Sequence, residues 1–361
     1  MHTEIRLKQI LDAANRDTRG RIELIARESG IARHTVRKLY HNEAHVFSLR
    51  TIGTLCDWLE KNGLGEGLPG SLFTARPSNL FEALTKSGHV SMLVGVYTGR
   101  GRPGFRASLA RDDFSVAARL VERLSRPSEH AVRFTHIHVP SHMPVDGHEL
   151  DPSVLERDQT EAQRTLDNVR HKSKSRTTVM IGSQRANYTV ECFVADLLNA
   201  SAFSSENSPV PFYLKYHERE VSSSCFGGIN APVPAASSAP VGIYFRHRNK
   251  PDWEFFPSKP REHGTGMVIV RRDPGLGRVE LAVFGLSGIA TAAMGKILCN
   301  TPEKFWPEPG VRAGIEVGVY VCGFKIANMK TDEQDIDTIT IEEPTIVKLD
   351  VDIRGKRRRV G

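Results

Sequence analysis

The sequence lacks the paired cysteines that mark a disulfide framework or a structural zinc site. Its five cysteines are an odd number, lie far apart in the chain and never form a C-x-x-C pair. A dispersed set of this kind indicates reduced, buried thiols. The five are Cys56, Cys192, Cys225, Cys299 and Cys322.

Long apolar runs are also absent. No stretch approaches the roughly 18 consecutive apolar residues that a membrane-spanning helix needs. The N-terminal segment, MHTEIRLKQI, carries charges where a secretory signal needs its apolar stretch. We therefore expect a cytoplasmic protein without a membrane partner.

Acidic residues are fewer than basic ones: 42 Asp and Glu against 49 Lys and Arg, a formal net charge of +7. A basic balance favours a polyanionic partner, because Lys and Arg displace counterions from phosphates. Charge alone does not identify such a partner, so this argument counts only together with a nucleic-acid-binding motif. At 361 residues the chain is long enough for two domains, each with its own core.

The N-terminal region has the pattern of four short helices. Apolar residues recur at helical spacing in residues 4–15, 22–29, 33–40 and 49–63. Gly30 follows the second of these segments, where a residue free to adopt positive φ ends a helix. A helix, a glycine-containing turn and a second helix form the arrangement that lays one helix in the major groove of DNA.

The stretch IELIARESGIARHTVRKLYHNEAHVFSLRTIGTLCDWL resembles the helix-turn-helix of the lambda-repressor/Cro (XRE-like) family, and the resemblance covers residues 4–63. It depends on a small residue in the second helix, a glycine in the turn, and apolar residues after the glycine and in the third helix. These are Ala26, Gly30, Ile31 and Val36. The chain departs from the pattern at Ala32, where Ser or Thr usually caps the recognition helix, and this weakens the cap by about 1 kcal/mol. It also departs in the His-rich loop after Tyr40.

The resemblance implies a DNA-binding domain at residues 1–65 that reads a double-stranded operator, and a homodimer that reads two half-sites. We expect four side chains of the third helix to face the major groove and two more basic residues to lie near phosphates. The first group is Arg33, His34, Thr35 and Arg37, and the second is Lys38 and Arg50. The alternative is a helical bundle that uses the same pattern only for packing or for protein contacts.

Residues 66–80 are rich in Gly and Pro and are predicted to be a linker. In residues 81–361, apolar segments with strand character alternate with amphipathic helical segments. This alternation predicts an α/β domain with a largely parallel, twisted sheet. The expected fold class is thus an all-α N-terminal domain followed by an α/β sensor or effector domain.

Two strand-to-helix junctions are the best candidates for a ligand site. Residues 182–187 (GSQRAN) and 285–291 (GLSGIAT) each join an apolar strand to the start of a helix. Helix N-termini favour anions, and in a parallel sheet both junctions open on one edge. We predict a shared pocket for an anionic, nucleotide-like ligand, lined by Gly182, Ser183, Arg185, Asn187, Ser287 and Thr291. Alternatively, both are ordinary turns with helix caps.

Other motifs are weaker. GRGRPG at residues 99–104 has the letters of a dinucleotide fingerprint, but a proline lies inside it and the helix follows too late. His136 and His138 have the spacing to share one face of a strand, yet prolines interrupt the loop after them. We predict no metal and no cofactor. The basic run 355–359 is most simply a solvated tail.

The sequence therefore predicts a transcriptional regulator, most simply a repressor, whose α/β domain senses a small ligand. Two alternatives stay open. The α/β domain could be an enzyme, such as a nucleotide or phosphate-ester hydrolase, although no nucleophile, base and orienting group form a recognisable set. It could also bind a protein, as in an antitoxin-type or defence-associated repressor.

Overall fold

The computed structural model describes residues 3–5, 7–13, 20–43, 47–64, 73–75, 77–97, 108–126, 131–141, 152–172, 177–204, 208–216, 224–226, 240–248, 250, 252–274, 276–307, 315–329 and 338–351. The motif at 99–104 and the basic run 355–359 lie outside these residues.

Four short helices form the N-terminal unit and pack around a core of their own. Val36, Leu39 and Leu55 are fully buried at its centre. A hydrogen bond also joins α4 to α2: Trp58 Nε1 donates to Glu28 Oε2 at 3.0 Å. The helices are α1 (Leu7–Ala13), α2 (Arg21–Ser29), α3 (Arg33–Tyr40) and α4 (Leu49–Lys61).

This unit was expected to be all-α, but it also contains a two-stranded antiparallel sheet. Strand β1 (Thr3–Ile5) pairs with β2 (Phe73–Ala75), which comes from the segment expected to be a linker. The Ile5 amide also donates to Asn42 Oδ1 at 2.9 Å. A local pattern could not show this pairing, because the partner strand is remote in sequence.

An eight-stranded sheet lies at the centre of the α/β domain. Its order is β13-β12-β10-β11-β6-β3-β4, and β5 pairs with β3. The neighbours β11, β6, β3 and β5 are parallel, whereas β13, β12, β10 and β4 pair antiparallel with their neighbours. The predicted α/β domain is present, and most strands of its sheet run in the same direction, although antiparallel strands make the sheet mixed. The physical reason is the tight turn after Asp273, which joins β10 to β11 as a hairpin.

The strands of this sheet are β3 (His89–Tyr97), β4 (Ser108–Leu109), β5 (Arg133–Ser141), β6 (Thr177–Ile181), β10 (His263–Asp273), β11 (Arg278–Gly285), β12 (Glu316–Ala327) and β13 (Thr340–Leu349). The segments that cover it are α6 (Leu80–Thr85), α7 (Arg111–Ser125), α8 (Pro152–Lys172), α9 (Tyr188–Leu198), α10 (Gly288–Asn300) and the 3₁₀ helix η1 (Pro302–Phe305).

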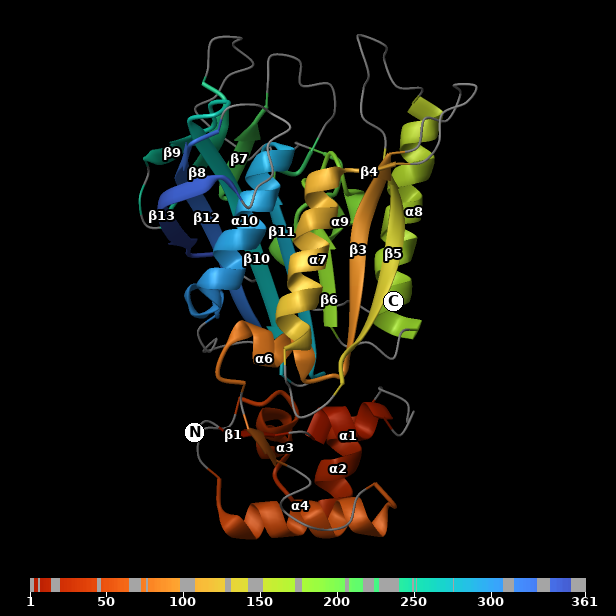
Figure 1. Ribbon diagram of the computed structural model, residues 1–361. Helices are drawn as coiled ribbons and strands as arrows, with labels where there is room; N and C mark the ends of the chain where they lie inside the picture. The colour runs from red at the N-terminus through yellow and green to blue at the C-terminus, as the bar shows by residue number, and fades with distance from the viewer. Residues whose placement is uncertain are drawn as a thin grey trace.

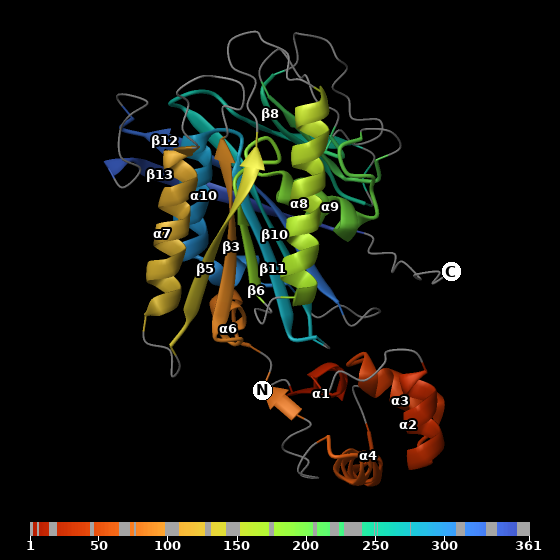
Figure 2. The same ribbon diagram turned by 90° about the vertical axis from the view of Figure 1, so that its right-hand side faces the viewer.

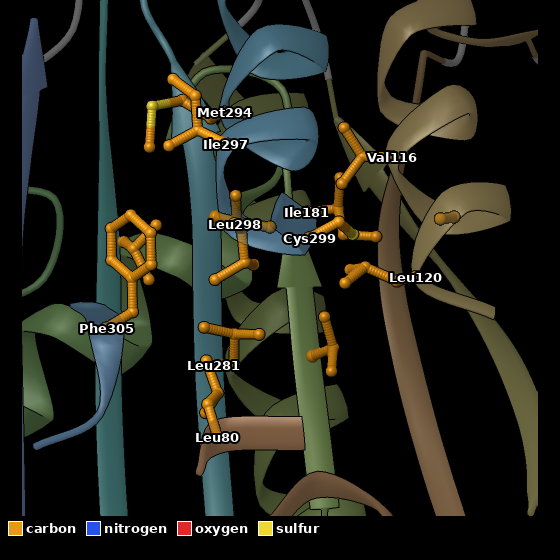
Figure 3. Close-up of a cluster of buried hydrophobic side chains, with 14 of the residues drawn as sticks. Leu80, Val116, Leu120, Ile181, Leu281, Met294, Ile297, Leu298, Cys299 and Phe305 are labelled. Carbon is orange, nitrogen blue, oxygen red and sulfur yellow. The ribbon is translucent and has the colours of Figure 1, made fainter. Parts of the chain in front are cut away.

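Helices cover both faces of the sheet, with α7 and α10 on one side and α8 and α9 on the other (Figure 2). The strands are therefore apolar on both faces. In β6, Val179 and Ile181 belong to the core under α7 and α10, while Met180 belongs to the core under α8 and α9. Figure 3 shows the first of these cores, to which Leu120 of α7, Leu281 of β11 and Leu298 of α10 belong.

A second, three-stranded antiparallel sheet packs its inner face into the core under α9. It consists of β7 (Phe212–Lys215), β8 (Gly242–Arg246) and β9 (Trp253–Pro257), of which β9 was not expected from the sequence. Phe212 and Phe245 are its buried anchors. Among the described residues, no helix has the length and apolar character to cross a membrane. All five cysteines are free and buried, as predicted.

The N-terminal helices lie beyond the edge of the large sheet where the parallel strands begin (Figure 1). There the hairpin between β10 and β11 meets α1, and Lys8 Nζ lies 3.7 Å from Asp273 Oδ2. The opposite edge, where β3, β6 and β11 end, points away from these helices (Figure 1).

The pairing of β2 with β1 indicates where the chain can be cut between its two folded units. A protease site inserted between Ala75 and Pro77 leaves β2 on the N-terminal piece, so cleavage there should leave two folded pieces. We expect the cut chain to show separate cooperative thermal transitions. Aggregation of the C-terminal piece after cleavage would show that the two units share a core.

Candidate functional site

The turn between α2 and α3 has the geometry that the sequence predicts. Gly30 adopts the left-handed conformation, with φ of 73°, and its amide donates to the Ala26 carbonyl. Ile31 is buried behind it. Ala32 precedes α3 and supplies no side-chain cap, as its methyl group requires. Because Gly30 needs no Cβ in this conformation, α3 can turn sharply away from α2.

The exposed face of α3 is basic, while its inner face is apolar. Val36, Leu39 and Tyr40 are buried, and Arg33, His34, Arg37 and Lys38 are exposed. Thr35 is half-buried between the two faces, and Arg50 is exposed in the first turn of α4. The structure thus leaves the predicted DNA contacts on the surface of one unit, not covered by the α/β domain.

One of these side chains already has an ionic partner. The Arg33 guanidinium forms a salt bridge with Glu23 of α2, and both side chains are more than half exposed. A backbone hydrogen bond and the interaction with Arg33 hold the pKa of Glu23 below its usual value. An exposed pair of this kind is weak, so Arg33 can exchange Glu23 for a base or a phosphate.

The two predicted ligand turns lie side by side. Strands β6 and β11 are parallel neighbours, with Ile181 opposite Val283, so the turns that follow them leave the same edge of the sheet. The neighbour on the other side, β3, is also parallel to β6. The prediction that both turns open on one edge is therefore confirmed.

The turn after β6 is tied to the ends of two strands by Asn187. This side chain donates from Nδ2 to the carbonyl oxygens of Leu93 and Ile181, at 2.9 and 3.0 Å. Its Oδ1 accepts from Thr189 and caps α9. Asn187 is completely buried, and its polar groups are used within the protein. This corrects its predicted role as a ligand contact.

Two glycines let this turn form. Gly182 has φ of 102°, a conformation that other residues rarely adopt. A Cβ atom on Gly95 of β3 would lie 1.6 Å from the Ala186 carbonyl oxygen, so the turn can pack on β3 only because Gly95 has no side chain. Ser183, the residue after Gly182 in this turn, is nearly buried.

The turn after β11 is built in a similar way. Thr291 Oγ1 accepts from the Gly285 amide at 3.0 Å and donates to the Ser287 carbonyl at 3.1 Å. Because Thr291 is buried, we assign it, like Asn187, to the fold rather than to a ligand. Ser287 caps α10 by accepting from the Ala290 amide, but it remains exposed.

Two adjacent carboxylates from the start of α7 meet these turns, and the sequence pattern did not single out either. A Cβ atom on Gly182 would lie 2.7 Å from Asp113 Oδ2, and one on Gly288 would lie 2.1 Å from Asp112 Oδ2. The pair opens α7, which comes in the chain after β3 and the short strand β4; because β4 pairs with the last residues of β3, α7 begins near the end of that third parallel strand.

Asp113 has an unusual environment. It is only 3% exposed, and its Oδ2 has no hydrogen-bond partner among the described residues. Burial, with a smaller contribution from the charge of Asp112, raises the pKa of Asp113 to about 7. Burial also raises the pKa of Asp112 above its usual value, against the opposing effect of Arg111. Asp113 therefore exchanges its proton near neutral pH.

Aromatic and polar side chains also gather at this edge of the sheet. Tyr216 donates to Gln184 Oε1 at 2.9 Å, and the Arg185 guanidinium lies 4.0 Å from the centre of the Tyr216 ring. Tyr97, at the end of β3, has a pKa raised above its usual value by burial first and by the charge of Asp113 second. Tyr97 and Asp113 are thus close enough to interact.

A cavity of about 320 Å³ opens beside the turn after β11. Its polar lining includes Asp112, Tyr216, Ser287, Lys259, Arg261 and His263, and its apolar lining includes Leu286, Ile289, Ile326 and Met329. Gly182, Ser183, Arg185, Asn187 and Thr291 are not among the residues that line it. The structure thus brings the two turns together, but the described cavity adjoins only the second.

The described part of the chain contains no group of three or more His, Cys, Asp or Glu residues that could hold a metal ion. His136 and His138 are both exposed on β5, and the acidic and histidine residues that follow them at 142–151 lie outside the described residues. Comparisons with protein-family models, with curated proteins and with solved structures found no match for this chain.

Proposed function

We propose that this protein is a DNA-binding transcriptional regulator of the helix-turn-helix type, most simply a repressor, and that its α/β domain binds a small ligand. The observation that supports this most directly is the exposed basic face of α3, which follows a left-handed glycine turn and stands on an apolar core. A helix so presented fits the major groove, with its N-terminal residues near the base edges.

The proposed division of contacts follows from position. Arg33, His34 and Arg37 lie on the exposed face of α3 and would read bases, whereas Lys38 and Arg50 would hold phosphates. A homodimer would place two α3 helices in successive major grooves about one DNA turn apart.

The ligand would act from the far edge of the α/β domain. Strand β11 connects the two regions: it begins at the hairpin beside Lys8 and ends at the turn before α10. Its eight residues cover about 26 Å. A ligand alters operator affinity only by its differential affinity for two conformations, typically by about 1–3 kcal/mol.

Substitution of the base-reading arginines tests the DNA-binding proposal. Duplexes would first be selected by the full-length chain from a random pool. We expect Arg37→Ala to weaken binding of the selected duplex by about 1–3 kcal/mol and to relax specificity at one position. Lys38→Ala should weaken all sequences alike and lower the salt dependence of binding.

The matched control is Arg123→Ala, which removes an exposed arginine of α7 in the other domain. It should leave duplex affinity unchanged. If the pool yields no enriched duplex, or if Arg33→Ala and Arg37→Ala both bind as tightly as the unaltered chain, the proposed DNA interface is wrong.

An enzymatic α/β domain is a second candidate, and one observation favours it. Asp113 is a buried carboxyl group with a pKa of about 7 at the carboxyl edge of parallel strands, which suits a general acid or base. No nucleophile and orienting group accompany it in a recognisable arrangement among the described residues, so we give preference to ligand sensing.

A further inference from the structure

The sheet of β7, β8 and β9 has one face in the core and one face outside it. Phe212, Phe245 and Phe256 lie on the inner face, where they belong to the core under α9 or pack against it. Because side chains alternate along a strand, the residues between these positions lie on the opposite, outer face. Four aromatic side chains of the outer face are half-buried and belong to none of the hydrophobic cores of the described residues. They are Tyr213, Tyr244, Trp253 and Phe255.

Three of these rings form a row across the strands. Tyr213 of β7 is paired with Tyr244 of β8, which is paired with Phe255 of β9. The ring centres of Tyr213 and Tyr244 are 6.3 Å apart, and those of Tyr244 and Phe255 are 4.4 Å apart. Gly242 makes room for the row, because a Cβ atom on it would overlap the Phe255 ring. A row of rings on an outer sheet face is a surface on which other flat rings can stack.

Two cations on the same face have no carboxylate partner among the described residues. Arg246 is paired across the strands with Trp253, and its guanidinium lies 5.2 Å from the centre of the Trp253 ring. Lys215, two residues after Tyr213, is only 5% exposed, and no described residue forms an ion pair or a side-chain hydrogen bond with it. Burial of an unpaired ammonium group is costly, and an anionic ligand beside it would offset that cost.

A row of rings beside unpaired cations suits single-stranded nucleic acid. Its bases offer flat faces for stacking, and its phosphates offer negative charge to Arg246 and Lys215. Neighbouring strands are about 4.8 Å apart, so a row across three strands spans about 10 Å, which is enough for two or three bases. The bases of a duplex are already stacked on one another and cannot use such a row. A proline-rich peptide also binds aromatic surfaces, but it would leave both cations without an anionic partner.

We infer that the outer face of β7, β8 and β9 binds single-stranded nucleic acid, with bases stacked on Tyr213, Tyr244 and Phe255 and phosphates beside Arg246 and Lys215. This interaction goes beyond the proposed binding of duplex DNA by α3 and does not depend on it. The three-stranded sheet lies at the end of the α/β domain that points away from the N-terminal helices (Figure 1).

Fluorescence anisotropy of the full-length chain with short labelled strands tests the inference. The probes are oligothymidine, oligouridine and an abasic strand of equal length, which keeps the phosphates but has no bases. We expect oligothymidine or oligouridine to bind, and the abasic strand to bind about ten-fold more weakly or worse, because it cannot stack. Electrostatic attraction alone would bind all three strands alike.

Variants of the row separate stacking from charge. Phe255→Leu and Tyr244→Leu each remove a ring and should lower affinity for the preferred strand by about ten-fold, whereas Phe255→Tyr keeps the ring and should bind normally. Arg246→Gln should reduce the salt dependence of binding. The matched control is Phe114→Leu, which removes an aromatic ring of α7 that is 53% exposed, and it should bind normally. Thermal unfolding of each variant distinguishes a lost contact from a lost fold.

Equal affinity for the abasic strand and the strands with bases, normal binding by the folded Phe255→Leu variant, or no binding of any single strand would overturn the inference. So would binding of a proline-rich peptide in place of the strands. Arg37→Ala in α3 should leave single-strand binding unchanged, and a loss there would place the strand on α3 instead. Duplex binding, measured on the same samples, shows separately whether the proposed regulator function holds.

Discussion

Asp113→Asn should stabilise the protein at pH 8 by up to about 4 kcal/mol and leave its stability unchanged near pH 3. The carboxyl group has an ordinary pKa of 3.8 when exposed, and its pKa in the folded protein is about 7. A pKa difference of one between the folded and unfolded states corresponds to about 1.4 kcal/mol, which gives the upper limit stated. Asn resembles the protonated carboxyl group in size and does not ionise.

The sign follows from which state binds more protons. Between roughly pH 4 and pH 7 the folded protein holds the Asp113 proton and the unfolded chain has lost it, so this group's contribution to stability falls as pH rises. Above pH 7 the loss is complete. Asp112 and Tyr97 interact electrostatically with the Asp113 carboxyl group, and burial raises the pKa of Asp112 as well, so Asp112 also contributes to the pH dependence.

Urea unfolding of the α/β domain across this pH range would measure the difference between the variant and the unaltered chain. Glu122→Gln, the exposed carboxylate on the same helix, is the control and should show no pH-dependent difference. A pH-independent difference, or a destabilised Asp113→Asn at pH 8, would contradict the prediction. If it holds, a carboxylate that lowers stability occupies a position where selection for stability alone would not keep it.

Glu280→Ala should destabilise the α/β domain by about 3–5 kcal/mol. Glu280 is fully buried on β11, and its Oε1 accepts from Arg170 Nε of α8 at 2.6 Å. Arg271 of β10 lies 3.5 Å from Oε2 and 2.9 Å from Asp196 of α9, which is 3.3 Å from Arg170. The four charges alternate in a closed ring.

Removal of Glu280 would leave the largely buried Arg170 with only the partly exposed Asp196 as a partner in this ring. The desolvation of the guanidinium would then no longer be offset, and this is the physical source of the loss. The midpoint and slope of urea unfolding give the measurement.

Glu254→Ala is a suitable control, because Glu254 pairs with Lys250 on the surface and should contribute less than about 1 kcal/mol. A loss at Glu280 no larger than this would show that the buried ring adds little net stability. Arg170→Met combined with Glu280→Met should be less harmful than Glu280→Ala, since it removes both partners together.

Segments with strong periodicity were the best predicted. Within residues 81–361 the alternation of apolar and amphipathic segments was predicted, and β6 (Thr177–Ile181) and α7 (Arg111–Ser125) are examples of it, because burial on both sheet faces and on one helix face leaves patterns that local inspection detects. The hairpin between β10 and β11 also has a local cause, because Pro274 suits the tight turn that follows Asp273. Strand β9 was missed, since its run contains Glu254 and ends in Pro257.

The candidate site was predicted only in outline. The shared edge of the turns after β6 and β11 followed from the order strand, turn, helix, and the structure confirms it. The sequence did not show which polar groups of these turns are free to contact a ligand. Asn187 and Thr291 bond to backbone groups of strands, and Asp113 enters from a helix about seventy residues away in sequence.

The sequence alone determined the local elements of this protein: the glycine turn between α2 and α3, the alternation of strands and helices, and the caps at Asn187 and Ser287. These depend on interactions within a few residues, which composition and spacing report directly. The tertiary structure decided the mixed direction of the sheet, the pairing of β1 with β2, and the burial of Asp113 against Gly182. Each of these joins segments far apart in the chain, and their partners are set by packing rather than by local preference.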